Sequence, residues 1–259
     1  MKMKNIILII LLTFGLNTIN AKCSSTGMKF FPKSQKISLK SMFIIEGYAL
    51  SQTIVISFKN RKIYLVSSTG ELIKLKLIET LKGQMLLTQA IFKTETELKP
   101  NTKYFLKYSN ETKEEIAERQ IWNSRNQKLE VVCWETTEKE NNDLLNPNLK
   151  IEFNKTKVEY FGCGPSANAE FNVVNSNNSE IWYKTEVIEL STGKKTEFYL
   201  TINENKISVG HGMCSGAFTY NKNGKYKARF IPLNADGKEL LFTDWTEYES
   251  PFQSDKLNK

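Results

Sequence analysis

The residues with the clearest potential for chemistry lie in the stretch from Val209 to Phe218, which holds the chain's single histidine. His211 stands between two glycines, and Cys214 and Ser215 follow it within four residues. Because an imidazole titrates near neutral pH, His211 paired with the Cys214 thiol or the Ser215 hydroxyl would have the parts of a hydrolase. The alternative is a structural role, in which the glycines let the backbone turn with positive φ and His211 donates one hydrogen bond.

The cysteines favour the structural role. Four are present, Cys23, Cys133, Cys163 and Cys214, and an even number in an exported chain indicates two disulfides, with three pairings open. A disulfide sulfur is no thiolate nucleophile, so we expect no catalytic residue. The cysteines form no CxxC pair and one histidine cannot complete a zinc set, so we also expect no metal and no cofactor.

Two other patterns with possible chemistry are better explained without it. The glycines of Gly210-x-Gly212-x-x-x-Gly216 lack the Lys-Ser/Thr ending of a phosphate-binding loop. The acidic pairs Glu114/Glu115 and Glu135/Glu138 are sequence neighbours on polar stretches, whereas glycoside hydrolysis needs two carboxylates held across a cleft. We therefore interpret both acidic pairs as solvated faces.

Aromatic side chains are the best candidates for a ligand or partner surface, since such side chains dominate binding contacts. The aromatics that could form such a platform are Trp122, Trp134, Trp182, Trp245, Tyr183, Tyr199 and Tyr248. The predicted surface combines Trp182, Tyr183, Trp245 and Tyr248 with His211. Trp182 and Tyr183 are neighbours on one predicted strand, so one of the two is expected to face outward. The alternative is that a β-sandwich core takes up these aromatics.

Residues 1–21 have the parts of a secretory signal peptide: Lys2 and Lys4, an apolar run from Ile6 to Leu12, and Ala21 at the exit. Cleavage is predicted after Ala21. Lys22 stands before Cys23, where a lipoprotein signal requires a small residue, so lipid anchoring is disfavoured. No later segment approaches ~18 consecutive apolar residues, so no integral membrane segment is expected after cleavage.

The formal charge of +8, or +6 after removal of Lys2 and Lys4, is spread along the chain. No cluster of lysine and arginine with interleaved aromatics stands out, so nucleic acid is not an expected partner. We predict a protein or glycan partner in the cell envelope.

Short apolar runs alternate with polar or glycine turns, a pattern typical of an all-β sandwich or barrel. In the first half the predicted strands are 27–31, 42–45, 53–58, 62–66, 72–78, 85–92, 104–108 and 128–136, with a turn or two of helix within 111–125. In the second half they are 149–153, 158–161, 167–173, 181–190, 197–202, 206–209, 217–220, 225–233 and 240–245, the last two joined by an Asp236-Gly237 turn.

The segment from Leu98 to Tyr108 contains Leu-x-Pro-x-Thr-x-Tyr at the start of an alternating strand. This motif resembles the entry to the penultimate strand of bacterial Ig-like and fibronectin type III domains of secreted and cell-envelope proteins. The resemblance implies that the Tyr104 hydroxyl ties back to the preceding corner. Tyr226 precedes the Asp236-Gly237 hairpin in a similar way.

With this resemblance we predict two tandem Ig-like or fibronectin-like antiparallel sandwiches: residues 22–138 and 148–252, with a linker at 139–147 and a polar tail at 253–259. In such a sandwich the first and last strands often lie side by side, which implies a Cys23–Cys133 pair. Cys163 would then pair with Cys214.

The predicted function is binding or scaffolding by an exported, non-enzymatic protein in the periplasm, on the surface or outside the cell. One alternative is a secreted hydrolase, or an inhibitor of one, acting through the loops around His211. Another is strand addition to a larger secretion or adhesion system.

Overall fold

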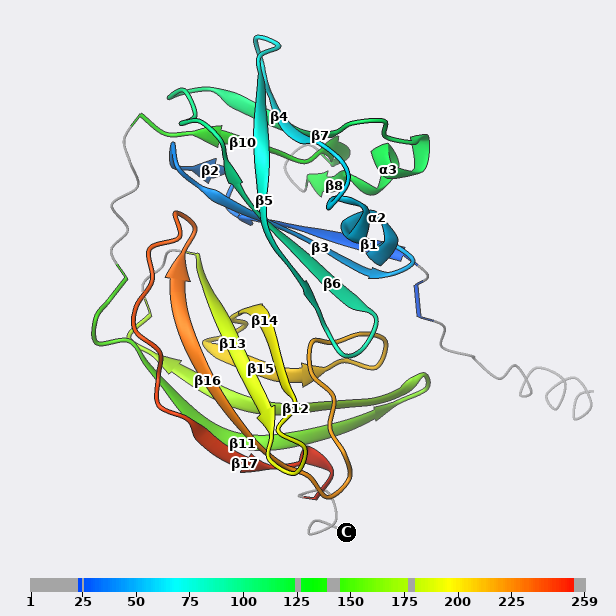
Figure 1. Cartoon of the computed structure of the whole chain (residues 1–259), viewed down its shortest axis with the longest axis vertical. Helices are drawn as coiled ribbons and strands as arrows, with labels where there is room; N and C mark the ends of the chain where they lie inside the picture. Colours follow the sequence, from blue (N-terminus) through cyan, green and yellow to red (C-terminus); the bar gives the residue numbers. More distant parts are fainter. Residues whose placement is uncertain (1–22, 25, 124–126, 139–144, 177–179, 254–259) are drawn as a thin grey trace, which may run out of the picture.

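The computed structural model describes residues 23–24, 26–123, 127–138, 145–176 and 180–253. The predicted signal peptide (1–21) lies outside the described residues, as do 139–144 of the predicted linker and 254–259 of the polar tail. The described part is all-β, as predicted, and its sheets form a sandwich-like arrangement (Figure 1). It also contains the short helices α2 (Gln52–Ser57) and α3 (Lys113–Glu118), of which only α3 was predicted as helix. Within it, no helix has the length and apolar character needed to cross a bilayer.

The N-terminal region, residues 26–136, is built on one curled eight-stranded sheet. Because β5 is long and has a register shift between Leu77 and Glu79, it pairs with β4 at one end and β6 at the other. The strands in sheet order are β1 (Thr26–Phe31), β3 (Met42–Ala49), β6 (Leu87–Thr94), β5 (Leu72–Lys82), β4 (Ile63–Ser67), β7 (Lys103–Tyr108), β10 (Cys133–Thr136) and β2 (Lys36–Ile37).

Alternating apolar side chains of this sheet meet in one core. Burial along β4 and β7 has a period of two, as expected for strands with one face inside. Trp134 lies in this core, edge-on to Phe43 with ring centroids 4.8 Å apart. The burial of these apolar faces holds the two ends of the curled sheet together.

The predicted strand at 53–58 is wrong: this segment is the helix α2 (Gln52–Ser57). Its β-branched residues favour strands, but only Val55 and the adjoining Phe58 are buried, three residues apart on one helical face. The predicted helical turns after Glu111 are confirmed as α3 (Lys113–Glu118), which begins with a reciprocal Thr112–Glu115 capping box.

The predicted tyrosine corner contact is confirmed. Tyr104 is fully buried, and its hydroxyl accepts a 2.9 Å hydrogen bond from the Lys99 backbone N–H. In the second half, the Tyr226 hydroxyl accepts a 2.7 Å bond from the Asn221 N–H. Both contacts bind the start of a strand to the corner before it.

Tyr104→Phe is expected to lower the free energy of unfolding by about 1–2 kcal/mol, because the Lys99 N–H loses its acceptor. The matched control is Tyr108→Phe on the same strand, since in the described residues the buried Tyr108 hydroxyl has no hydrogen-bond partner. Removal of that hydroxyl should be neutral or slightly stabilising. Urea unfolding followed by circular dichroism checks both, and equal losses would contradict the corner's role.

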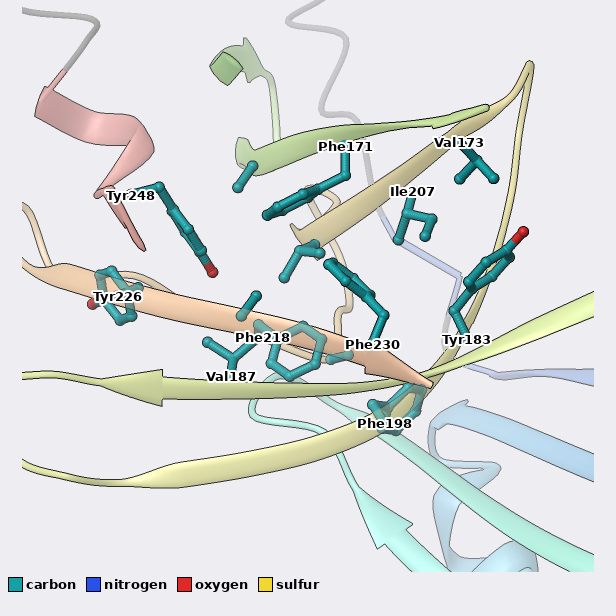
Figure 2. Close-up of a cluster of buried hydrophobic side chains, with 14 of the residues drawn as sticks. Phe171, Val173, Tyr183, Val187, Phe198, Ile207, Phe218, Tyr226, Phe230 and Tyr248 are labelled. Carbon is teal, nitrogen blue, oxygen red and sulfur yellow. The ribbon is translucent and has the colours of Figure 1, made fainter. Parts of the chain in front are cut away.

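The C-terminal region, residues 145–253, has two facing sheets. The first contains β11 (Lys150–Phe161), β12 (Gly164–Val174) and β15 (Lys206–His211); the second contains β14 (Lys195–Thr201), β13 (Ile181–Glu189), β16 (Lys225–Asn234) and β17 (Thr246–Glu249). Figure 2 shows Phe171 and Ile207 pointing from the first sheet toward Phe230 of the second. Phe171 and Phe230 meet edge to face, with centroids 4.9 Å apart.

Two predicted strands of this region are absent from the described residues. The Asp236-Gly237 turn is confirmed, with Gly237 at φ +75°, but 240–245 forms no strand, and β17 begins one residue later at Thr246. Leu240 and Thr243 instead donate single backbone bonds to β16. Residues 217–220 also form no strand.

The two regions pack tightly against each other. A buried cluster spans them, formed by Phe31, Met42, Ile44, Ile91, Trp182, Tyr199 and Leu233. The side-chain amide of Gln89 bonds to the backbone of Tyr199 as a neighbouring strand would. Its Nε2 donates to the Tyr199 carbonyl at 2.9 Å, and its Oε1 accepts from the Tyr199 N–H at 3.1 Å. The Met42 N–H donates to the Ala235 carbonyl at 2.7 Å.

The predicted disulfide pairings are wrong. Cys23 is bonded to Cys214, 191 residues away, which excludes both Cys23–Cys133 and Cys163–Cys214. The predicted pair required the first strand to lie beside the last, but β1 pairs with β3, and the strand beside β10 is β2. Cys23, which precedes β1, is therefore far from the β10 edge and next to the C-terminal region.

Candidate functional site

Three adjoining hollows surround the β8–β9 hairpin (Gln120–Asn123 and Lys128–Val131) and β10. Their volumes are about 740, 520 and 290 Å³. Glu130 and Cys133 line all three, so these two residues mark the centre. We call the hollow of about 740 Å³ the hairpin groove; its lining is Lys33, Ser34, Gln35, Lys36, Ile121, Trp122, Asn123, Glu130, Val131, Cys133 and Glu135.

Arg119 fixes the base of the hairpin. It caps the C-terminus of α3, is buried, and donates to the Leu106 carbonyl and, at 2.5 Å, to Glu111. The carbonyl of Arg119 accepts the Val132 N–H at 2.9 Å. The base of the hairpin is therefore hydrogen-bonded to a buried residue that is itself bonded to β7 and to Glu111.

The hairpin carries apolar side chains that no core covers. Trp122 is 62% exposed and Leu129 60%, and these two are direct cross-strand partners. Ile121, 37% exposed, lines the groove. An exposed aromatic next to aliphatic side chains is typical of interaction surfaces.

Both signs of charge line the groove. Lys36 pairs with Glu135 at 2.8 Å, and Asn123 donates to Glu130 at 2.7 Å. Burial is the main cause that lowers the pKa of Lys33. A lining of this kind suits a ligand with mixed polarity rather than a polyanion.

Cys133 is a half-buried thiol at this centre. Burial raises its pKa above the usual thiol value, and the nearby ammonium of Lys103, which also hydrogen-bonds the sulfur, offsets part of this. A raised pKa leaves less thiolate at neutral pH, so Cys133 is poorly suited to nucleophilic work. In the described residues, no group of three or more His, Cys, Asp or Glu side chains could hold a metal ion.

We expect Cys133, in a Cys163→Ser background, to react with a maleimide more slowly at pH 8 than an unburied thiol does. The rate should keep rising with pH to above 9, since the thiolate forms only near the raised pKa. Lys103→Met should slow labelling further by removing the stabilising charge. Lys107→Met on the same strand is the matched control, and an equal effect of both substitutions would contradict the role of Lys103.

The predicted aromatic surface is not assembled on the outside. Trp182, Tyr183 and Tyr248 are buried, with exposed fractions of 0%, 0% and 5%. The expectation that either Trp182 or Tyr183 faces outward is wrong, because the N-terminal region covers the outer face of β13 and encloses Trp182. Tyr183 and Tyr248 lie in the core of the C-terminal region (Figure 2).

Trp245 is half-buried, and two cationic side chains lie over its ring. The Arg229 guanidinium lies 4.5 Å from its ring centroid and the Lys227 ammonium 4.9 Å. Arg229 also donates to the buried Glu186 at 2.7 Å. These contacts give Trp245 a packing role on the outer face of β16.

His211 is buried at the end of β15, and its Nδ1 lies 2.8 Å from the Gly212 carbonyl oxygen. In the described residues, this is the only hydrogen bond of the ring. The glycines around it let neighbouring backbone segments pack closely. A Cβ on Gly210 would lie 2.0 Å from the Ala167 oxygen, and a Cβ on Gly216 would lie 2.2 Å from the His211 Cβ. Cys214, in its disulfide, supplies no thiolate to this histidine.

The sequence does not predict the hairpin groove: Trp122 is one of the candidate aromatics, but Cys133, the central residue of the groove, is expected in a disulfide. The available signal was the pair Ile121-Trp122 and the cross-strand Leu129, apolar residues in a polar stretch between α3 and the last strand of the sheet. Their exposure depends on how the hairpin projects, which sequence spacing does not give.

Fold and site together define an all-β, sandwich-like protein with an apolar-and-charged groove beside a projecting hairpin. No protein-family model matches the chain, and no curated protein matches it.

Several solved structures match the chain at 9–10% sequence identity. Pullulanase from Anoxybacillus sp. LM18-11 gives a TM-score of 0.25 at 9% identity, covering 86% of this chain and 25% of the pullulanase. E. coli alpha-2-macroglobulin gives 0.25 at 9% identity, covering 90% and 14%. A DUF4785 family protein from Legionella pneumophila gives 0.24 at 10% identity, covering 90% and 59%. The chain spans less than two thirds of each of these proteins, and TM-scores at this level do not relate its function to theirs.

Proposed function

We propose that this is an exported, non-enzymatic binding protein that holds a protein partner in the hairpin groove. The observation that carries the proposal is the position of Ile121, Trp122 and Leu129, exposed on a projecting hairpin beside a hollow of about 740 Å³. Burial of such side chains by a partner would supply the driving force, and the mixed charges would set its orientation.

Two tandem Ig-like or fibronectin-like sandwiches would provide the frame. In the N-terminal region, β1-β3-β6-β5 followed by β4-β7-β10 has the succession expected of the ABED and CFG sheets of an Ig domain. In the C-terminal region, three strands face four. In both regions a tyrosine lies at the start of the strand that is last but one, in chain order, in its sheet: β7 before β10, and β16 before β17. These features support the resemblance inferred from the Tyr104 motif.

Export is supported by the signal-like residues 1–21 and by the Cys23–Cys214 disulfide, a bond that persists in oxidising compartments. If the protein is exported, its mature form should begin at Lys22 by mass spectrometry and be recovered outside the cytoplasm. Recovery of the uncleaved chain in the cytoplasm would contradict this part of the proposal.

The predicted hydrolase alternative would need a nucleophile paired with His211. Cys214 is disulfide-bonded and supplies no thiolate, and in the described residues the imidazole is hydrogen-bonded to the Gly212 carbonyl and not to the Ser215 hydroxyl. An inhibitor of a hydrolase would be one case of protein binding. A partner-dependent role therefore has more support than turnover.

Photo-crosslinking from the groove tests the proposal. A benzophenone maleimide is attached to Cys133 in the Cys163→Ser chain, and the chain is returned to cells that make the protein. We expect a crosslinked protein that is lost in the Trp122→Ala/Leu129→Ala variant. It should be kept in Leu241→Ala, because Leu241 is 90% exposed but does not line the groove. The same reagent on Lys194→Cys, in a chain lacking Cys133 and Cys163, should capture nothing. Equal capture from both positions would contradict a specific groove.

A further inference from the structure

One long edge of the strand that carries Cys133 has no partner in the described residues. Residues 128–136 run as one strand through β9 and β10 with an interruption at Val132. Along one edge this strand pairs first with β8 and then with β7. Along the other, β2 pairs only with Glu135 and Thr136.

The backbone hydrogen bonds assign residues to the two edges. The Val132 N–H donates to Arg119 and its carbonyl accepts from Leu106, and the Thr136 N–H donates to Thr102. Even-numbered residues therefore face β8 and β7. The Glu135 N–H donates to Gln35 on the opposite side, so odd-numbered residues face β2 and the groove.

Three odd-numbered residues lie beyond the reach of β2: Leu129, Val131 and Cys133. In the described part of the chain, no backbone group of these residues pairs across the groove. The N–H and C=O groups of three alternate residues thus form a row that faces the hairpin groove, which Val131 and Cys133 line.

The segment that could have closed this edge is held elsewhere. The N–H groups of Lys33 and Ser34 both donate to Glu180 Oε2, at 2.6 and 3.0 Å. Glu180 Oε1 accepts from the Trp182 indole at 2.9 Å, which fixes the carboxylate. The C-terminal region therefore holds residues 33–34 away from Cys133, and the groove is the space that results.

We propose that the hairpin groove binds an extended polypeptide segment, which adds as a strand along the edge from Leu129 to Cys133. This inference rests on the proposed function and specifies the partner's chemistry. Backbone groups spaced two residues apart are matched by another extended backbone, and an edge of five residues spans about 13–17 Å, enough for a segment of about five residues. The exposed Leu129 belongs to this edge, and its cross-strand partner Trp122 on β8 lines the same groove, where both can contact the segment's side chains.

Hydrogen exchange on the free protein is the first test. The amides of Leu129, Val131 and Cys133 should exchange rapidly, and those of Val132 and Thr136 should be protected, since only the latter donate within the sheet. Protection of all five in the free protein would mean that the edge is already occupied and would overturn the inference.

The second test uses a synthetic peptide chosen from a phage-displayed library of nine-residue peptides by binding to the full chain. The peptide should slow exchange of the Val131 and Cys133 amides at least tenfold. N-methylation should weaken binding at least tenfold at the alternate peptide residues whose N–H groups face the protein edge. At the residues between them it should weaken binding less than threefold. If N-methylation weakens binding at every position or at none, the peptide binds as a helix or through side chains alone, and the inference is wrong.

A substitution in the protein provides the third test. Val131→Pro removes an edge-facing N–H that makes no hydrogen bond within the sheet, so peptide affinity should fall at least tenfold, whereas Val131→Ala should stay within threefold. If Val131→Pro does not fold, the peptide N-methylation pattern decides alone. Selection of no groove-binding peptide overturns strand addition, yet crosslinking of a partner from Cys133 would still uphold the proposed function. If a peptide binds along the edge but no partner is crosslinked from Cys133, the result contradicts the proposed function and leaves strand addition standing.

Discussion

Trp182→Ala should lower the free energy of unfolding by about 3–5 kcal/mol, the range for truncating a large buried aromatic. Trp182 has no exposed surface and lies in the cluster that joins the two regions. Its removal leaves a cavity between the regions, and Glu180 Oε1 loses the indole donor. Urea unfolding by circular dichroism should show a lower midpoint.

Two controls separate the causes. Trp182→Phe keeps most of the packing but removes the indole N–H, so its loss should be smaller than that of Trp182→Ala. Trp122→Ala deletes a tryptophan that is 62% exposed and should change stability by only about 0.5 kcal/mol. If Trp182→Ala and Trp122→Ala had the same small effect, the two regions would not be packed through this cluster.

Loss of the Cys23–Cys214 disulfide is expected to destabilise the chain by about 5 kcal/mol in the chain-entropy model, because the bond closes a loop of 191 residues in the unfolded state. The variant is Cys23→Ser/Cys214→Ser, which leaves no new thiol from this pair. Chemical unfolding under non-reducing conditions measures the loss.

Cys133→Ser and Cys163→Ser are the matched controls and should each cost about 1 kcal/mol or less, since neither removes this cross-link. Non-reducing peptide mapping should recover one peptide pair containing Cys23 and Cys214. Recovery of Cys163 joined to Cys214 instead, or a Cys23→Ser/Cys214→Ser variant as stable as the parent, would contradict the observed connectivity.

Interactions between neighbours along the chain were predictable. The Tyr104 corner depends on residues five positions apart, and the Asp236-Gly237 turn and the capping box of α3 span two to four residues. Each is stabilised by a hydrogen bond or a backbone preference that the local residues supply by themselves. The helix α2 is the exception, because packing of Val55 and Phe58 on the core outweighs the strand preference of its β-branched residues.

The amino-acid sequence by itself determined the all-β class, the corner motifs and the alternation that divides strand faces, since all of these follow from short-range backbone and side-chain chemistry. Only the tertiary structure decided that Cys23 joins Cys214, that both Trp182 and Tyr183 are buried, and that Glu180 holds residues 33–34 away from the β10 edge. These outcomes depend on how one region docks on the other. A contact between residues more than a hundred positions apart leaves no periodic trace in either segment, so spacing could not have indicated it.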